Sequence, residues 1–491
     1  MMNKVIIGFS VIALLFVTAC EGIANPFFPA ANDNGSITDK SVDNNIDDDK
    51  DKDKDKDKDD DKDKDNDKDK NKEEEEEEEE EKDEDKEDED KEDPPLLVWS
   101  FTDKLEDMVK NYYMNEFPDV KIDYSSISSD AFEDDLDQAL ESGSGAPDIF
   151  ALDSASVRKY IESGQLLDIT DVYERNKDKL LKYPVEIGTY EGRVYAMSWQ
   201  ACPGAMIYRR SYAKLLLGTD NPATVQTYFT DLDTFLRTSE LLKVRANGRC
   251  LIVSSGDDLY RVFLGSRSSP WIVNNKLTID PNMEKYLDIR KIIHDNRYDA
   301  RIDQWSDDWF AGMKDELKDN IGYSSYDFLY VFAYFLPTWG LDILELNLPG
   351  TADDWAMIPG PAPYSWGGTW IGANKETKNP EQVMEIIEYL TTNDDFLEAW
   401  ARETGDIVSN TDVIDNIKND FSKPFLGGQN HYEAFARIAT NVDGTLVQGT
   451  DQVIDSLFLE EARAYRNGEK SKAQALADFK ANVKSTLGFE Y

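Results

Sequence analysis

The sequence predicts an α/β protein whose globular part is divided into two lobes. Short apolar strands alternate with helical segments from Leu96 onward, and this pattern predicts a mostly parallel sheet covered by helices on both faces. The globular part holds ~400 residues, more than the ~250–300 at which a single hydrophobic core usually stops growing. Two later segments rich in Pro, Gly and Ser are places where the chain can cross between lobes.

The first elements follow the strand and helix alternation closely. Leu96–Ser100 is a short apolar strand, Asp103–Phe117 is a helix and Val120–Ser125 is a second strand. After another helix comes the strand Asp148–Leu152, which Gly145-Ala146-Pro147 introduces. Ligands of parallel sheets bind beyond the carboxyl ends of the strands. The residues at these ends are Ser100, Thr102, Asp103, Asp153 and Ser154.

The crossings between lobes are predicted further along the chain. The strand Gly192–Trp199 leads into Gln200-Ala201-Cys202-Pro203-Gly204, and Ala205–Arg209 resumes as a strand. A later strand, Trp355–Ile358, runs into the Pro- and Gly-rich segment Pro359–Gly368. Because Gly and Pro interrupt regular elements, we expect both segments to connect the lobes.

The N-terminus has the pattern of a secretory signal. Lys4 precedes an apolar run from Val5 to Val17, and small residues lead to Cys20. A spanning helix needs ~20 apolar residues, and this run is shorter. Val17-Thr18-Ala19-Cys20 resembles the bacterial lipobox, in which the cysteine receives a diacylglycerol, and two acyl chains anchor a protein stably. We therefore expect residues 1–19 to be a signal peptide and Cys20 to be lipidated; the alternative is a chance cysteine beside a signal.

Residues 20–42 are expected to be the lipidated N-terminus and a linker, and residues 43–95 an acidic tether. Between Asp43 and Asp93 the chain has 33 acidic and 13 basic residues. With so little apolar surface this stretch cannot bury a core. It holds a net −20 of the formal charge of −46, which leaves −26 for the rest. Nucleic acid is therefore not an expected partner, because its binding depends on Lys and Arg.

Few residues are available for the common catalytic and metal sites. After Cys20 the only cysteines are Cys202 and Cys250, and the only histidines are His294 and His431. We therefore expect no metal, no cofactor and no enzymatic activity. Glycoside hydrolysis needs only two carboxylates and stays an alternative. We expect no disulfide, because Cys250 opens a strand that should start far from the crossing at Cys202.

Aromatic residues stand where strands should end. Five such indoles, each beside Gly, Pro, Ser or Thr, are those of Trp99, Trp199, Trp339, Trp366 and Trp370. Sugar rings have apolar C–H faces that stack on indole and hydroxyl groups that bind Asp, Gln and Ser. The pattern favours saccharide binding, whereas Trp355 and Trp400, inside regular elements, are interpreted as core residues.

Four blocks resemble one known family over Leu96–Tyr491. They are LLVWSFTDKLEDMVKNYYMNEFPDVKI, APDIFALDSASVRKYIESGQLLDIT, GRVYAMSWQACPGAMIYRRSYAK and WAMIPGPAPYSWGGTWIGANKETKNPEQVMEIIEYLTT. In order and spacing they resemble the extracellular solute-binding proteins, family 1, of sugar ABC importers. The resemblance implies a two-lobed, periplasmic-binding-protein-like (type II) fold with a hinge and an interlobe ligand cleft. Residues 96–203 and 360–400 would form lobe 1, and residues 204–359 and 401–491 lobe 2.

The resemblance also implies site residues. VFAYFLPTWG would deliver Trp339 to the cleft, WGGTW would deliver Trp366 and Gly367, and the SPW segment Trp271. The complete set expected to bind the ligand is Trp99, Thr102, Asp103, Asp153, Trp199, Gln200, Asp258, Trp271, Trp339, Trp366, Gly367 and Trp370.

Two departures from the family pattern affect this set. Arg209-Arg210-Ser211 stands where the family usually has a basic residue and then Asp, and Ser211 is expected to cap the following helix. The extra segment GYSSYDFLY carries Tyr323 and Tyr326, which are expected to reshape the pocket.

The function that the resemblance implies is capture without turnover. A monomer anchored on the extracellular face of the bacterial cytoplasmic membrane would close on a sugar, expected to be an oligosaccharide, and deliver it to the permease subunits of an ABC importer. A carbohydrate-binding surface adhesin and a glycoside hydrolase stay as alternatives.

Overall fold

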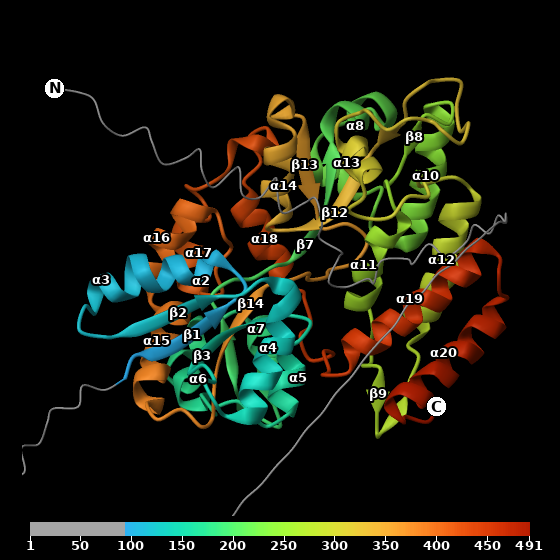
Figure 1. Ribbon diagram of the computed structural model, residues 1–491. Helices are drawn as coiled ribbons and strands as arrows, with labels where there is room; N and C mark the ends of the chain where they lie inside the picture. Colours follow the sequence, from blue (N-terminus) through green and yellow to red (C-terminus); the bar gives the residue numbers. More distant parts are fainter. Residues whose placement is uncertain (1–93) are drawn as a thin grey trace, which may run out of the picture. The chain divides into compact units, whose positions relative to one another are not determined.

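A five-stranded sheet organises the first lobe, in the order β2-β1-β3-β14-β6. This computed structural model describes residues 94–491, so the predicted signal peptide, Cys20 and nearly all of the acidic tether lie outside the described residues. β1 pairs in parallel with β2 and β3, whereas β14 pairs antiparallel with β3 and β6 (Figure 1). The strands are β1 (Leu96–Ser100), β2 (Ile122–Ser126), β3 (Ile149–Asp153), β6 (Ala196–Ser198) and β14 (Thr369–Ala373).

Helices of the first lobe come from both ends of its sequence. The predicted helix from Asp103 ends at Glu116 and contains one wider π-type stretch. In α15 the residues Val383, Ile386, Ile387 and Leu390 recur at helical spacing and are buried. The elements are α2 (Asp103–Asp107), η1 (Met108–Tyr113), α3 (Met114–Glu116), α4 (Ser129–Ser142), α5 (Val157–Glu162), α6 (Thr170–Asn176), η2 (Lys177–Lys179), α7 (Lys182–Ile187), β4 (Thr189–Tyr190), β5 (Arg193–Val194), α15 (Pro380–Thr392) and α16 (Asp394–Thr404).

A three-stranded antiparallel sheet, β12-β7-β13, organises the second lobe. Beside it, β8 pairs in parallel with β11, and β9 pairs antiparallel with β10. The strands are β7 (Gly204–Arg209), β8 (Cys250–Leu251), β9 (Ile272–Val273), β10 (Lys276–Leu277), β11 (Tyr330–Val331), β12 (Ala333–Pro337) and β13 (Trp355–Ile358).

Helices surround these strands, and α19 and α20 pack against each other (Figure 1). The helices are α8 (Arg210–Leu217), α9 (Pro222–Gln226), α10 (Leu232–Arg245), η3 (Gly256–Leu259), α11 (Tyr260–Gly265), α12 (Pro281–Asp295), α13 (Asp307–Met313), α14 (Gly340–Asn347), η4 (Pro349–Thr351), α17 (Thr411–Ile417), η5 (Pro424–Leu426), α18 (His431–Ala439), α19 (Asp451–Asn467) and α20 (Lys472–Leu487). Among the described residues no helix is long and apolar enough to cross a membrane.

The parallel pairing predicted from the opening alternation is confirmed for β2, β1 and β3, whereas β14 and the sheets of the second lobe depart from it. Most strand pairs in the described residues are antiparallel, including all those of the β12-β7-β13 sheet. The physical reason is the connectivity of the chain. β14 enters the first sheet from the second lobe and therefore runs against β3, whereas strand and helix alternation alone predicts strands that run the same way.

Three chain segments lie side by side where the two lobes join. The first crossing, residues 199–204, is in the middle. Its Cys202 O accepts a hydrogen bond from Trp366 N at 3.0 Å, and its Ala201 N donates to Ile407 O at 2.6 Å. Each large sheet takes its strands from one predicted lobe. The exact lobe boundaries stay a prediction.

The beginning of α8 corrects a capping prediction. Ser211 lies inside the helix rather than before it. Asp354, on the loop before β13, accepts hydrogen bonds from Ser211 N and Ser211 Oγ, both at 2.7 Å, and pairs with Arg209 Nε at 2.8 Å. A carboxylate far away in the sequence therefore performs the capping role that we had assigned to Ser211.

Candidate functional site

A cavity of about 130 Å³ lies between the two predicted lobes. Ser154 and Ala155, which follow β3, line it from the first lobe, and residues of α11 and α19 line it from the second. The second crossing forms a further wall with Trp366 and Gly367. Because strand ends, both lobes and a crossing segment meet here, we take this interlobe cavity as part of the candidate site.

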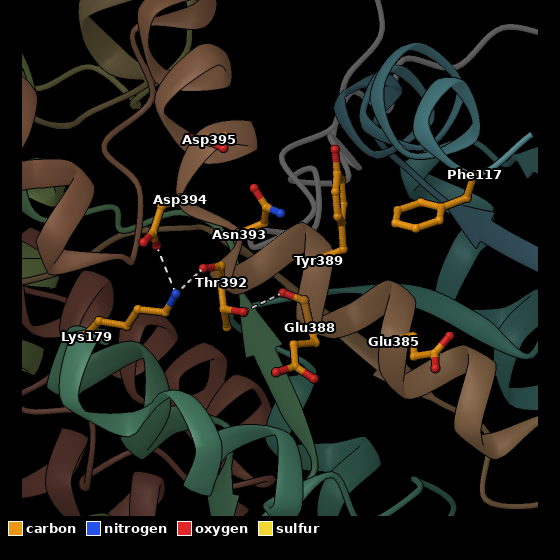
Figure 2. Close-up of a pocket in the computed structure, with 9 residues that line it drawn as sticks. All are labelled: Phe117, Lys179, Glu385, Glu388, Tyr389, Thr392, Asn393, Asp394 and Asp395. Carbon is orange, nitrogen blue, oxygen red and sulfur yellow. Dashed lines mark hydrogen bonds and ion pairs between the residues drawn. The ribbon is translucent and has the colours of Figure 1, made fainter.

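A second depression, on the first lobe, is larger but less suited to a ligand. It measures about 520 Å³ and lies between α15, η2 and the start of α16 (Figure 2). Three of its charged side chains, those of Lys179, Glu388 and Asp394, already bind protein groups. Lys179 Nζ, for example, donates to Thr392 O at 2.7 Å and pairs with Asp394 at 2.9 Å. None of the predicted ligand residues lines this depression.

Four indoles gather beside the interlobe cavity, and we call them the tryptophan cluster: Trp305, Trp309, Trp339 and Trp366. The ring centroids of Trp339 and Trp366 are 5.1 Å apart, and Trp339 Nε1 donates to Trp366 O at 3.1 Å. Gly367 makes this approach possible, because a Cβ there would lie 2.9 Å from Trp339 Nε1. The structure therefore brings together Trp339, Trp366 and Gly367, three of the predicted residues.

Trp305 belongs to the cluster, although the sequence analysis missed it. Its ring stacks on Trp339 with centroids 6.0 Å apart and an interplanar angle of 24°. Its φ of 69° lies in the left-handed region, which is uncommon for a bulky residue and costs roughly 1–3 kcal/mol. A signal was available, because Trp305 stands directly before Ser306, in the same kind of sequence context as the other selected indoles.

Asp258 holds part of the tryptophan cluster in place through hydrogen bonds. Only 2% of it is exposed. It accepts hydrogen bonds from Gln304 Nε2 at 2.8 Å and from Trp309 Nε1 at 3.3 Å. Burial raises the pKa of the Asp258 carboxyl well above its usual range. Asp258 thus holds Trp309 and the segment that carries Trp305, and in this structure it has almost no surface to offer a ligand.

Asp153 ends β3 and lies on the first-lobe side of the site. Its Oδ1 accepts from Ala155 N at 2.8 Å. Burial raises the pKa of Asp153, and the positive charge of Arg261 on α11 acts in the opposite direction. Arg261 also lies over the ring of Trp366, with 5.7 Å between its guanidinium carbon and the ring centroid. Arg261 is a second functional candidate that the sequence analysis missed.

The predicted residues at the end of β1 and just after it have local structural roles. Trp99 is half-buried against the core, and Thr102 caps α2 by accepting from Lys104 N at 3.3 Å. Asp103, the next residue, is exposed. Lys104 Nζ reaches Asp406 Oδ1, 2.6 Å away, and so ties α2 to the chain segment around Ile407 that binds the first crossing.

Three predicted indoles are fully buried and offer no face to a ligand in this structure. Trp370 Nε1 donates to Pro184 O at 2.8 Å, and Trp271 Nε1 donates to Asp455 Oδ1 at 2.8 Å. Trp199 is enclosed at the start of the first crossing, where the next residue, the partly exposed Gln200, donates from Nε2 to Thr369 Oγ1 at 3.3 Å. Trp355 and Trp400 are buried as interpreted.

The segment with Tyr323 and Tyr326 lies at the other end of the second lobe. Tyr326 packs on Arg249, and Tyr323 packs on Arg297 and on Arg301. Arg249 directly precedes β8, whereas Asp258 comes after that strand, so the two tyrosines and the cluster occupy opposite strand ends. Neither tyrosine lines the interlobe cavity, so they do not shape this part of the candidate site. Cys202 and Cys250 are both buried free thiols.

Comparisons with known proteins agree with this architecture. The family described as bacterial extracellular solute-binding protein matches residues 99–395. An arabinooligosaccharide-binding protein of Halalkalibacterium halodurans is 22% identical over 369 residues, which are 71% of this chain and 79% of that protein.

Solved structures are similar over the same part of the chain. One, an extracellular solute-binding protein family 1 member, has a TM-score of 0.70 at 18% identity, covering 80% of this chain and 99% of its own. Another is an ABC transporter associated binding protein from B. animalis subsp. lactis in complex with β-1,6-galactobiose. Its TM-score is 0.60 at 20% identity, covering 80% of this chain and 97% of its own.

Proposed function

Because this chain belongs to the bacterial extracellular solute-binding protein family and has its two-lobed type II fold, we propose that it captures a sugar for an ABC importer. The ligand is an oligosaccharide held between the lobes. The observation that carries this proposal is the tryptophan cluster beside an interlobe cavity whose walls combine apolar side chains with several charged and polar ones.

The chemistry of the site suits saccharides. Indole faces stack on the C–H faces of sugar rings, and Trp339 and Trp305 are both partly exposed. Around Trp366 the cavity has carboxylates, guanidinium groups and an amide that can hydrogen-bond hydroxyl groups. The arabinooligosaccharide-binding relative and the structure with β-1,6-galactobiose support a sugar of this kind.

The protein captures its ligand when the two lobes close on it. The loop between α18 and α19 contacts the first lobe, since Gly444 N donates to Glu186 Oε2 at 3.1 Å and Gly449 N donates to Glu162 Oε1 at 3.2 Å. A ligand that touches both lobes binds the closed form more tightly and shifts the population toward it. The permease subunits of the importer then recognise the closed form.

The location of the protein is part of the proposal. The family is extracellular or periplasmic, and the pattern before Cys20 supports a lipid anchor on the extracellular face of the bacterial cytoplasmic membrane. We propose that the protein acts there as a monomer that binds its ligand without turnover.

Replacing Trp339 tests the sugar site. Trp339→Ala removes a stacking face, and we expect affinity for arabinotriose or β-1,6-galactobiose to fall at least tenfold, which corresponds to ~1.4 kcal/mol. Isothermal titration calorimetry with the wild type and the variant measures this change. Tyr326→Ala, which removes an exposed aromatic from the opposite end of the lobe, is the control and should bind as the wild type does.

Three possible results with these proteins and sugars separate the competing functions. Unchanged affinity in Trp339→Ala would remove Trp339 from the site. Chromatographic detection of shorter sugars would favour a glycoside hydrolase. Binding only to immobilised polysaccharide or to cells would favour a surface adhesin.

A further inference from the structure

A basic surface lies at the end of the second lobe that is opposite the tryptophan cluster. Three segments form it: residues 243–249 at the end of α10, residues 296–301 after α12 and residues 318–328 before β11. They hold six cationic and three acidic side chains, a net of +3 in a chain whose formal charge is −46. We call these three segments the basic face, because their charge is opposite in sign to that of the whole chain.

The three segments contact one another and form one continuous surface. Lys243 Nζ donates to Asn296 O at 2.8 Å, which joins the first segment to the second. The guanidinium carbon of Arg297 lies 5.3 Å from the ring centroid of Tyr323, which joins the second to the third. Gly248 approaches the same tyrosine so closely that a Cβ there would lie 2.5 Å from Tyr323 O. The charges of all three segments are therefore presented together.

The cations of the basic face are available to a partner. Among the described residues none of the six forms an ion pair, and four of them donate to backbone carbonyl oxygens. The six are Lys243, Arg245, Arg249, Arg297, Arg301 and Lys318. Of the three acids, Asp299 is buried and pairs with Arg290 at 2.7 Å, and Asp319 accepts from Tyr323 N at 2.8 Å. Only Asp327 among the three is exposed, so the accessible charge of the face is positive.

Two exposed arginines of the basic face have an unusual backbone conformation. Arg297 and Arg301 both have a φ of 58°, in the left-handed region that few residues other than Gly, Asn and Asp adopt. Such conformations persist where the surrounding structure fixes them, and they gather at functional positions. Here both guanidinium groups pack on the ring of Tyr323. Two positive charges are thus held at the surface at a cost in backbone energy, which favours a role for the charge.

Apolar side chains accompany these cations. Val244 is 61% exposed, Ile321 46% and Phe328 38%. Lys and Arg are attracted to the anionic headgroups of a bilayer, and apolar side chains enter the boundary between headgroups and acyl chains. A soluble polyanion would bind the cations but leave the apolar side chains in water. The combination therefore suits a lipid surface.

We propose that the basic face docks on the anionic phosphate headgroups of a lipid bilayer. Attraction is confined to this face, because the rest of the chain is acidic and charges farther than ~8–10 Å from the surface are screened. Docking of this kind is weak and reversible, and the proposed anchor at Cys20 makes it effective by keeping headgroups at a high local concentration. The inference goes beyond sugar capture, since the interlobe cavity and the basic face are separate surfaces.

Vesicle sedimentation of the chain from Glu21 to Tyr491 tests the docking. This chain keeps every described residue and lacks both the N-terminal apolar run and Cys20. We expect it to sediment with vesicles of equal parts phosphatidylglycerol and phosphatidylcholine but not with phosphatidylcholine alone. Raising NaCl from about 0.05 M to about 0.5 M should release it, because salt screens the attraction.

Two variants of the basic face should weaken sedimentation. Arg297→Asn/Arg301→Asn removes two cations and introduces a residue type that tolerates the left-handed backbone. We expect its partition onto the anionic vesicles to fall more than tenfold. Lys243→Gln, on a helix that accommodates Gln, removes one cation and should lower partition about fivefold.

The control removes two exposed cations from other surfaces. Lys378→Gln/Arg437→Gln changes the net charge by the same amount, before α15 and on α18, and should sediment as the wild type does. The docking proposal is overturned if the wild type does not sediment with anionic vesicles or sediments equally with neutral ones. Unchanged sedimentation of both basic-face variants, or an equal loss in the control, overturns it as well. Each of these results leaves sugar capture standing, because calorimetry with sugars is carried out without lipid.

Discussion

At the scale of single residues, burial decides the charge of His431. The side chain is almost completely enclosed, and its Nδ1 accepts a hydrogen bond from Lys423 N at 3.0 Å. Burial, together with the charge of Lys423, lowers the pKa of His431 to about 4. An unfolded chain protonates this histidine near pH 6.5. The unfolded state therefore binds the proton first, and stability falls as the pH drops from 6.5 toward 4.

His431→Asn should remove this part of the pH dependence. Asn offers an acceptor near the position of Nδ1 but does not titrate. Between pH 7.5 and pH 5 we expect the wild type to lose about 2 kcal/mol more of its unfolding free energy than the variant does. Urea unfolding at the two pH values measures this difference. Equal losses in both proteins would mean that the pKa of His431 is the same in the folded and unfolded states.

At the scale of elements, glutamine side chains complete the edges of short strands. β13 is an edge strand, and Gln429 binds Met357 in its middle. Gln429 Oε1 accepts from Met357 N at 2.9 Å, and its Nε2 donates to Met357 O at 2.8 Å. Gln448 makes the same double contact with Ile272 of β9. A side-chain amide thus replaces a neighbouring strand and satisfies backbone groups that would otherwise be unpaired.

Gln429→Leu should destabilise the protein by roughly 1–3 kcal/mol, because it leaves two buried backbone groups of Met357 without partners. Urea unfolding measures the loss, and faster hydrogen exchange at the Met357 amide would locate it. Gln474→Leu on α20 changes an exposed glutamine and should alter stability by less than ~0.5 kcal/mol. A similar loss in both variants would mean that the Met357 contacts contribute nothing specific.

Local patterns predicted elements well but not what joins them. The bounds of β1 and β13 agree with the sequence prediction, because short apolar runs between polar or turn-forming residues read directly as strands. The direction of β14 was not predictable in this way, since it depends on where the chain re-enters the first lobe. Asp354 at the start of α8 was missed for a similar reason, because this cap comes from a distant loop.

In the candidate site too, local sequence patterns predicted single residues but not the contacts between distant segments. Trp339, Trp366 and Gly367 stand at element ends, and the structure brings them together. Trp305 reaches these residues from an irregular segment, and its own backbone is left-handed. Such a segment has no hydrophobic periodicity from which its position could be predicted. Arg267 and Asp451, which line the interlobe cavity, form an ion pair although they are 184 positions apart in the sequence. Such a pair becomes visible only when the second lobe is assembled.

At the scale of the whole molecule, binding and delivery make separate demands on the chain. Every residue of the candidate site lies between Trp99 and Leu459. The residue proposed for anchoring, Cys20, precedes them all and lies outside the described residues. Capture should therefore depend on the two lobes alone, whereas delivery requires that the protein stay near its permease.

Cys20→Ala separates these two demands. We expect the variant to bind sugar with unchanged affinity in calorimetry, because no residue of the site is altered. Uptake of the same sugar by cells should be lost, because a protein without acyl chains leaves the membrane and its concentration beside the permease falls. A control with Cys250→Ser, which changes a buried cysteine of the second lobe, should stay anchored. Normal uptake from the medium by the Cys20→Ala strain would contradict the proposed anchor, since delivery would then not require attachment.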